Sequence, residues 1–283
     1  SWMTEKELKA VLELSTADKA TGMILGERKG QLVCLPENTR LNRHCAIFGA
    51  SGTMKSRAVI RNALFSVIRR GESAIISDPK SEMYNDMSEL FRQNGYEVKV
   101  FNLVDPTHSD SWNCMANLGS DTLMAQVLAN VIIGNTSEGK GDKFWDNGEL
   151  NLLKALILLV STSKARTEDQ KNLSEVYWSL INSTEKELKT MFERLEPGHP
   201  AKAPFNLFAQ SSDTVRSGII LGLGTRLQVL QNKEVTRIIS GNDIDLTAPG
   251  KRKCAYFIIL SDQEASMQFL SSLFFSFLFF FLL

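Results

Sequence analysis

Apolar runs and amphipathic stretches alternate along the first part of the chain. Residues 44–48 form a short apolar run typical of a buried strand, and residues 57–70 carry apolar positions at helical spacing up to Gly71. Two further apolar runs, 73–77 and 96–102, predict strands, with a helix between them that ends at Asn94-Gly95. Strands and helices that alternate through short turns predict a parallel sheet covered by helices.

The pattern differs before and after this region. Residues 22–26 and 30–35 predict a hairpin, and residues 254–260 predict a return to strand after Pro249-Gly250. Between residues 121 and 230 the apolar positions recur at helical spacing. The predicted helices are 121–133, 144–161, 173–181, 185–195 and 214–230. Asn172 and Thr184, each followed three residues later by Glu, predict helix N-terminal caps.

The chain ends in an apolar run, 269–283, that is shorter than the roughly 20 residues of a membrane span. We predict a buried core helix here, with a membrane anchor as the less favoured alternative. The order of elements predicts an α/β protein with an all-helical insertion. The predicted segments are an N-terminal segment 1–20, the first part of an α/β core 21–117, an all-helical insertion 118–240 and a return to the core at 241–283.

Composition narrows the possible functions. The 283 residues include 32 Lys+Arg and 32 Asp+Glu, so the overall charge predicts no general affinity for nucleic acid or anionic membranes. The four cysteines are far apart, which favours reduced, mostly buried thiols over a disulfide framework or a zinc site. They are Cys34, Cys45, Cys114 and Cys254.

The most specific chemical signal follows the run 44–48. Gly49, Lys55 and Ser56 fit the phosphate-loop pattern G-x-x-x-x-G-K-[ST], in which backbone N–H groups surround phosphate oxygens, Lys reaches the terminal phosphates and the hydroxyl reaches Mg²⁺. Met54 occupies the position of the second glycine. The alternatives are a plain tight turn between strand and helix, with Ser56 as a helix N-cap. The order strand, loop, helix favours the phosphate-binding interpretation.

Hydrolysis also needs a carboxylate at the end of a neighbouring strand to hold Mg²⁺. Asp78 and Asp262 both follow predicted strands, and neither is followed by Glu. A turn residue that ends the strand is an equally good interpretation of each. Lys80 and Glu82 either join a polar network near the phosphates or begin the next helix.

Aromatic and basic residues in the helical block invite a nucleic-acid interpretation. They are Phe144, Trp145, Tyr177, Trp178, Arg216 and Arg226. The better supported interpretation places Trp145 and Trp178 in the core, because they lie beside Leu and Ile at core spacing without a basic cluster.

Several motifs together resemble the TraG-like conjugal transfer ATPases, the coupling proteins of type IV secretion. The matching segments are Gly49-Ala50-Ser51-Gly52-Thr53-Met54-Lys55-Ser56-Arg57, Ser77-Asp78-Pro79-Lys80-Ser81-Glu82, Phe101-Asn102-Leu103, Asp110-Ser111-Trp112-Asn113, Gly141-Asp142-Lys143-Phe144-Trp145-Asp146-Asn147 and Ser212-Asp213-Thr214-Val215-Arg216-Ser217-Gly218. They span roughly residues 20–280 in one order. The Met-for-Gly exchange resembles a variant of the loop in the Gram-positive branch of the family.

The resemblance implies a RecA-like P-loop nucleotide-binding fold with an inserted all-helical domain. It implies that ATP and Mg²⁺ are the cofactors, with Ser56 on the metal. It also implies a hexameric motor anchored at the cytoplasmic face of the bacterial membrane, which links a relaxase and single-stranded DNA to the secretion channel proteins. The residues that would bind nucleotide are Gly49, Ala50, Ser51, Gly52, Thr53, Met54, Lys55, Ser56, Arg57 and Asp78.

Two features of the family are expected to lie outside this sequence. These are the N-terminal membrane helices and the strand ending in Asp-Glu that supplies the hydrolytic carboxylates. The chain is therefore expected to be a central part of an ATPase. Two alternatives are a degenerate P-loop module that serves assembly or docking without ATP turnover, and a stand-alone P-loop enzyme such as a small-molecule kinase.

Overall fold

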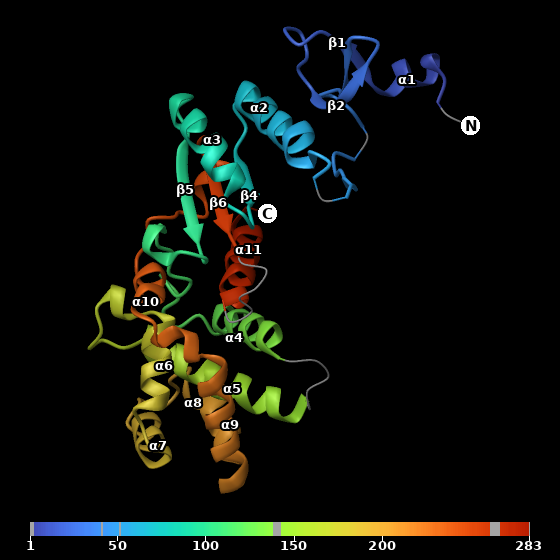
Figure 1. Cartoon of the computed structure of the whole chain (residues 1–283). Helices are drawn as coiled ribbons and strands as arrows, with labels where there is room; N and C mark the ends of the chain where they lie inside the picture. Colours follow the sequence, from blue (N-terminus) through green and yellow to red (C-terminus); the bar gives the residue numbers. More distant parts are fainter. Residues whose placement is uncertain (1–2, 41, 51, 138–142, 261–266, 283) are drawn as a thin grey trace. The chain divides into compact units, whose positions relative to one another are not determined.

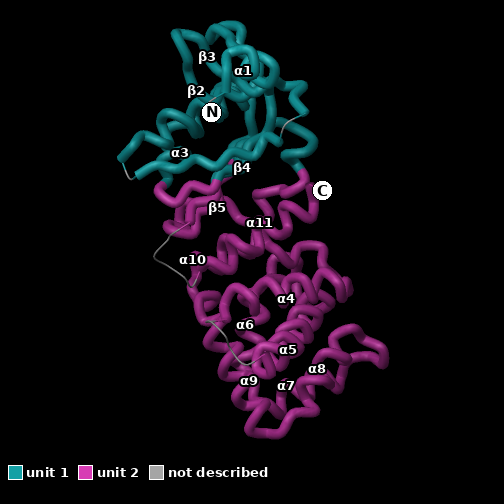
Figure 2. The backbone as a smooth tube through the Cα atoms, turned by 90° about the vertical axis from the view of Figure 1, so that its right-hand side faces the viewer, with its two compact units in different colours: residues 1–76, 81–98, 248–257 teal, residues 77–80, 99–247, 258–283 magenta. Residues whose placement is uncertain are grey.

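The computed structural model describes residues 3–40, 42–50, 52–137, 143–260 and 267–282. The chain forms two compact units, shown in teal and magenta in Figure 2. Unit 1 comprises Ser1–Ile76, Ser81–Val98 and Ala248–Phe257, and unit 2 comprises Ser77–Lys80, Lys99–Thr247 and Ile258–Leu283. Each unit therefore combines segments that are far apart in the sequence.

Unit 1 begins with helix α1 (Glu5–Val11) and a small antiparallel sheet of order β1-β3-β2. The strands are β1 (Glu13–Ser15), β2 (Met23–Arg28) and β3 (Gln31–Leu35). Lys29 and Gly30 connect β2 to β3, and their φ angles of 51° and 76° match a two-residue turn with both residues left-handed. The predicted hairpin is confirmed.

The helix predicted after the phosphate-loop motif is also confirmed. It starts as a π-helical turn, η1 (Ser56–Ile60), and continues as α2 (Arg61–Arg70). Gly71 ends it with φ 68°, a left-handed C-terminal cap that glycine adopts without a Cβ penalty. Helix α3 (Glu82–Gln93) follows the strand β4 (Ala74–Ser77) and ends before Asn94-Gly95, as predicted.

The central sheet has strands β4 (Ala74–Ser77), β5 (Glu97–Asn102) and β6 (Cys254–Ile259) in the order β4-β6-β5 (Figure 1). The N–H of Glu97 donates to the Lys253 carbonyl at 3.0 Å, and the N–H of Leu103 donates to the Ile259 carbonyl at 2.9 Å. Both pairs have the same sequence offset, as in a parallel ladder. All six residues of β6 are buried, which is typical of a central strand in a parallel sheet.

The prediction of a strand at residues 44–48 is wrong. In the described part of the chain these residues make no ladder hydrogen bonds, and Phe48 is 93% exposed. A strand is stable only where its N–H and C=O groups are paired with a neighbour. The apolar composition of the run does not supply that neighbour.

Unit 2 contains the helical block, and all five predicted helices are present. The helices are α4 (Thr122–Thr136), α5 (Lys143–Ser161), α6 (Leu173–Ile181), α7 (Glu185–Glu193), α8 (Lys202–Ala209), α9 (Asp213–Arg226) and α10 (Lys233–Ser240). Helices α8 and α10 were not predicted. Asn172 and Thr184 cap α6 and α7 as expected, by accepting from the N–H groups of Glu175 and Glu187.

The prediction that Trp145 and Trp178 lie in the core is wrong. Trp145 is 39% exposed and Trp178 is 37% exposed. Trp145 instead lies across Gly218 on α9, where an added Cβ would lie 2.8 Å from the indole ring. Helical spacing assigns a residue to one side of a helix, but it does not say how deeply a large ring can enter the core.

The apolar run at the end of the chain forms helix α11 (Gln268–Leu282), as predicted. Phe274 stacks on Phe101 with ring centroids 5.3 Å apart and meets Trp112 edge-on at 5.2 Å. The last turn, from Phe279 to Leu282, is exposed. Among the described residues no helix is both long and apolar enough to cross a membrane.

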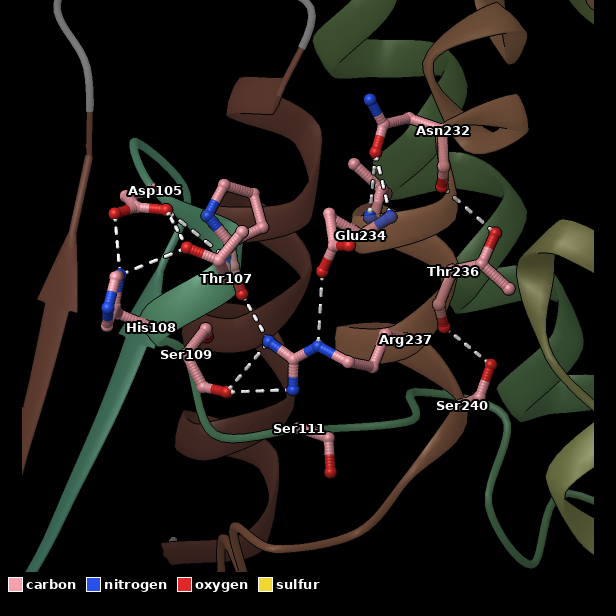
Figure 3. A network of polar contacts seen from close by, with 12 residues as sticks. Asp105, Thr107, His108, Ser109, Ser111, Asn232, Glu234, Thr236, Arg237 and Ser240 are labelled. Carbon is pink, nitrogen blue, oxygen red and sulfur yellow. Dashed lines mark hydrogen bonds and ion pairs between the residues drawn. The ribbon is translucent and has the colours of Figure 1, made fainter.

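Arg237 joins α10 to the segment that follows β5 (Figure 3). Its guanidinium donates to the carbonyl oxygens of Pro106 and Ser109 and pairs with Glu234. On the same segment the Ser111 hydroxyl donates to Asp243 at 2.5 Å. These bonds fix part of the Asp110–Asn113 motif against the end of the helical block.

Three of the four cysteines are buried, and all four are free thiols. Burial raises the pKa of Cys114 to about 12. Cys45 is exposed. The expectation of mostly buried thiols is confirmed.

A buried charge cluster joins α5 and α9. The Arg226 guanidinium pairs with Glu149 at 2.5 Å and with Asp146 at 2.7 Å. Glu149 is only 4% exposed, and it lies against Gly222, where an added Cβ would be 2.2 Å from Oε1. Burial raises the pKa of Glu149, and the attraction of Arg226 offsets only part of that effect.

We predict that Glu149→Gln raises the melting temperature at pH 7. The folded state holds the Glu149 proton more tightly than the unfolded chain, whose glutamate pKa is about 4.3. Stability from this group is therefore complete below the unfolded pKa and is lost as pH rises through the folded pKa. The gain in the variant should shrink as pH falls toward about 4, as followed by thermal melts against pH.

Asp146→Asn is the matched control, because it removes the other, more exposed partner of Arg226. It should lower the melting temperature at pH 7. A lower melting temperature in Glu149→Gln at pH 7 would contradict the assigned pKa direction.

Candidate functional site

The phosphate-loop segment lies in unit 1 and closes on itself through Lys55. Its Nζ donates to the carbonyl oxygens of Gly49 at 2.6 Å and Ala50 at 2.8 Å. Thr53 donates to the same Ala50 carbonyl through its hydroxyl at 2.8 Å and its N–H at 3.4 Å. The lysine side chain therefore reaches back across the loop to its first residues.

Gly49 allows the side chains of Thr53 and Lys55 to approach the backbone closely. An added Cβ would lie 2.6 Å from the Thr53 hydroxyl oxygen and 3.2 Å from the Lys55 side chain. Gly52 serves a different purpose, because its φ of 79° is a left-handed conformation with open space around it. Glycine therefore suits position 49 because space is short there, and it suits position 52 because the backbone angle is left-handed.

The backbone angle at Met54 shows why the phosphate-loop pattern has glycine at this position. Its φ is 61°, in the left-handed region, which costs a non-glycine residue roughly 1–2 kcal/mol. Its side chain is 60% exposed. The backbone at residue 54 is therefore outside the regions that a non-glycine residue ordinarily adopts.

The helix begins directly after the lysine. The N–H of Ala58 donates to the Met54 carbonyl at 2.8 Å, and the N–H of Arg61 donates to the Ser56 carbonyl. Lys55 precedes the first residue of the π-helical turn, and no side-chain hydrogen bond caps this turn. The alternative in which Ser56 acts as the N-cap is therefore wrong. Arg57 follows on the same turn and is exposed.

These features suit the binding of an anion. A helix N-terminus presents unpaired N–H groups and a positive dipole end, and Lys55 adds a full charge beside it. π-Helical turns are frequent at functional sites. The loop chemistry therefore fits the phosphates of a nucleotide, with the Ser56 hydroxyl near enough in sequence to hold a bound Mg²⁺.

The other predicted residues have different outcomes. Asp78 follows β4 as predicted; it belongs to unit 2, is 4% exposed, and its N–H donates to the Ile258 carbonyl at 2.9 Å. Its role toward Mg²⁺ stays a prediction. Glu82 is the first residue of α3, which confirms the simpler of its two interpretations. Ser51 and Asp262 lie outside the described residues.

The two arginines singled out in the helical block, Arg216 and Arg226, are paired with carboxylates. Arg216 is bound by Glu185 at 2.5 Å and Asp213 at 2.6 Å, and Arg226 is bound by Asp146 and Glu149. Because carboxylates neutralise these two arginines, their pairing favours the interpretation without a nucleic-acid surface. The burial predicted for the tryptophans was nevertheless wrong.

Sequence reasoning missed one interaction of the loop's helix. Arg61, the first residue of α2, pairs with Asp86 on α3. Nothing in the local sequence identifies the pair, because its members are 25 positions apart.

A family model described as "Type IV secretory system Conjugative DNA transfer" matches residues 1–282. The chain belongs to this family. No curated protein sequence matches it.

Solved structures of the bacterial conjugative coupling protein TrwB share the fold. The unbound monoclinic form aligns with a TM-score of 0.57 and 17% identity, covering 81% of this chain and 49% of TrwB. The complex with the non-hydrolysable GTP analogue GDPNP aligns with a TM-score of 0.56 and 18% identity, covering 81% of this chain and 50% of TrwB. The complex with ADP and Mg²⁺ aligns with a TM-score of 0.54 and 17% identity, covering 80% of this chain and 49% of TrwB.

The predicted fold class, an α/β RecA-like P-loop fold with a parallel sheet and inserted helices, is confirmed. The chain spans about half the length of the TrwB chains that it matches. The resemblance to TraG-like coupling proteins stated from the motifs is also confirmed.

Proposed function

We propose that residues 49–57 bind the phosphates of Mg-ATP in a protein of conjugative DNA transfer. The observation that carries the proposal is the closed loop itself. Gly49 admits the Lys55 side chain against the first carbonyls of the loop, and a helix begins immediately afterwards. Nucleotide complexes of TrwB, which shares the fold, add support.

Each residue has a defined part in this proposal. The Lys55 ammonium exchanges its carbonyl partners for oxygens of the terminal phosphates, to which its three N–H groups can donate. The backbone N–H groups from Gly49 to Lys55 surround the phosphates, and the Ser56 hydroxyl holds Mg²⁺. Mg²⁺ supplies the charge that offsets the phosphates.

At the level of the whole protein, the proposal is a coupling protein that links a relaxase and single-stranded DNA to the channel proteins of type IV secretion. ATP hydrolysis would drive the transfer, in a homo-hexamer held at the cytoplasmic face of the bacterial membrane. Family membership supports this extension. The chain itself carries the nucleotide-binding part of the proposal.

One observation favours a second candidate. The left-handed Met54 adds strain to the loop, which is what a degenerate P-loop used for assembly or docking would tolerate. Binding of nucleotide distinguishes the two functions, and the two variants below test it.

Lys55→Ala should abolish the rise in melting temperature that Mg-ADP produces in the wild-type protein. A ligand of the native state stabilises it by about 2.7 kcal/mol at 100 times its Kd, and a variant that does not bind gains nothing. Lys9→Ala, which changes an exposed lysine on α1, is the control and should keep the full shift. A normal shift in Lys55→Ala would rule out the site.

Met54→Gly should tighten Mg-ADP binding by up to about tenfold, in line with strain of roughly 1–2 kcal/mol at a left-handed non-glycine residue. Glycine frees the backbone N–H groups of the loop to approach the phosphates. Met54→Ala retains the Cβ and should improve binding less. Calorimetric titration measures all three proteins. Weaker binding by Met54→Gly would mean that methionine is an adapted part of the loop.

A further inference from the structure

The pair formed by Arg61 and Asp86 lies one turn from the phosphate loop. Arg61 ends the π-helical turn that begins at Ser56, because its N–H donates to the Ser56 carbonyl. Its guanidinium Nη2 pairs with Oδ2 of Asp86 on α3. The two side chains are 28% and 38% exposed, so the pair is partly shielded from water and salt.

Helix α3 is a firm support for Asp86. Tyr84 and Phe91 both meet Phe257 of β6 edge-on, with ring centroids 5.4 Å and 6.1 Å apart. Met87 and Phe91 are buried to 2% and 0% exposure. Asp86 therefore projects from a helix that is packed onto a buried strand within unit 1.

Regular backbone pairing does not support the segment that leads into the phosphate loop in the described part of the chain. Residues 44–48, which enter the loop, form no strand pairing in the described part of the chain. At its far end helix α2 is fixed by hydrogen bonds from Tyr96 to the Val67 carbonyl at 3.2 Å and from Arg69 to the Ala17 carbonyl at 3.0 Å. The π-helical turn at its start also lies close to β2. Among the described residues, Arg61–Asp86 is the ion pair of this helix nearest to the loop.

The Arg61 guanidinium has a second property that makes its partner important. Its Nε is buried and has no hydrogen-bond partner among the described residues. Loss of the carboxylate would leave two donors of one half-buried group unpaired, and such a group moves toward water. Arg61 also closes the turn Ser56–Ile60 through its own N–H, so the same residue belongs to the ion pair and to the turn that follows Lys55.

We infer that Asp86 is a positioning residue for the phosphate loop, acting through Arg61 and the π-helical turn. Asp86 does not touch the nucleotide in this account. It fixes the start of α2, so that the Lys55 ammonium and the loop N–H groups face the phosphates without a cost of ordering on binding. This inference rests on the proposed nucleotide site.

The test is a double-mutant cycle in Mg-ADP affinity with Arg61→Ala, Asp86→Ala and the double variant, measured by calorimetry. Each single variant should weaken binding about three- to fivefold, the range expected for loss of a partly exposed ion pair. The double variant should lose no more than either single variant, because both act through one contact. Asp86→Glu, which retains the charge, should recover most of the affinity.

Glu89→Ala is the matched control. It removes an exposed carboxylate from the same helix, one that pairs with Arg92 and accepts from Gln93, both on α3, and it should leave the affinity unchanged. A purely structural pair would lower the free energy of unfolding and leave the affinity of the folded protein as it was. Unchanged affinity in Asp86→Ala, with normal binding by the wild type, would overturn the inference. Failure of the wild type to bind Mg-ADP would instead overturn the proposed function.

Discussion

The candidate site depends on the close approach between Gly49 and the residues that follow it. Without a Cβ on residue 49, Thr53 and the methylene chain of Lys55 can fold back, and Nζ reaches the first two carbonyls of the loop. The turn needed for this return uses left-handed backbone at Gly52 and Met54. The position of Lys55 at the start of the helix is a consequence of that turn.

The elements of the chain were largely predictable because their signals are local. The hairpin turn, the Gly71 cap and the caps of α6 and α7 follow from residues that lie within a few positions of one another. Helices α8 and α10 were missed because each is only eight residues long, shorter than the roughly 11–18 residues over which helical periodicity is usually assessed. The order β4-β6-β5 could not be predicted, since it depends on a strand more than 150 residues further along the chain.

The failures have one physical cause in common, which is dependence on distant partners. Residues 44–48 have the composition of a strand, but pairing decides whether a strand forms. Trp145 and Trp178 have core spacing, but the exposure of Trp145 is set by the surface of α9 at Gly218. The Arg61–Asp86 pair is invisible to the motif for the same reason. At the site, the sequence identified the loop residues, and the structure added how they hold one another.

The central claim is that the loop at 49–57 receives the phosphates of a nucleotide. The most direct measurement is amide hydrogen exchange of the protein with and without saturating Mg-ADP, read by mass spectrometry on peptides that cover the loop and the start of its helix. The account predicts slower exchange in residues 49–60, with the β2–β3 hairpin unchanged as an internal reference. Unchanged exchange in residues 49–60, under conditions where Mg-ADP binding is independently measured, would contradict it.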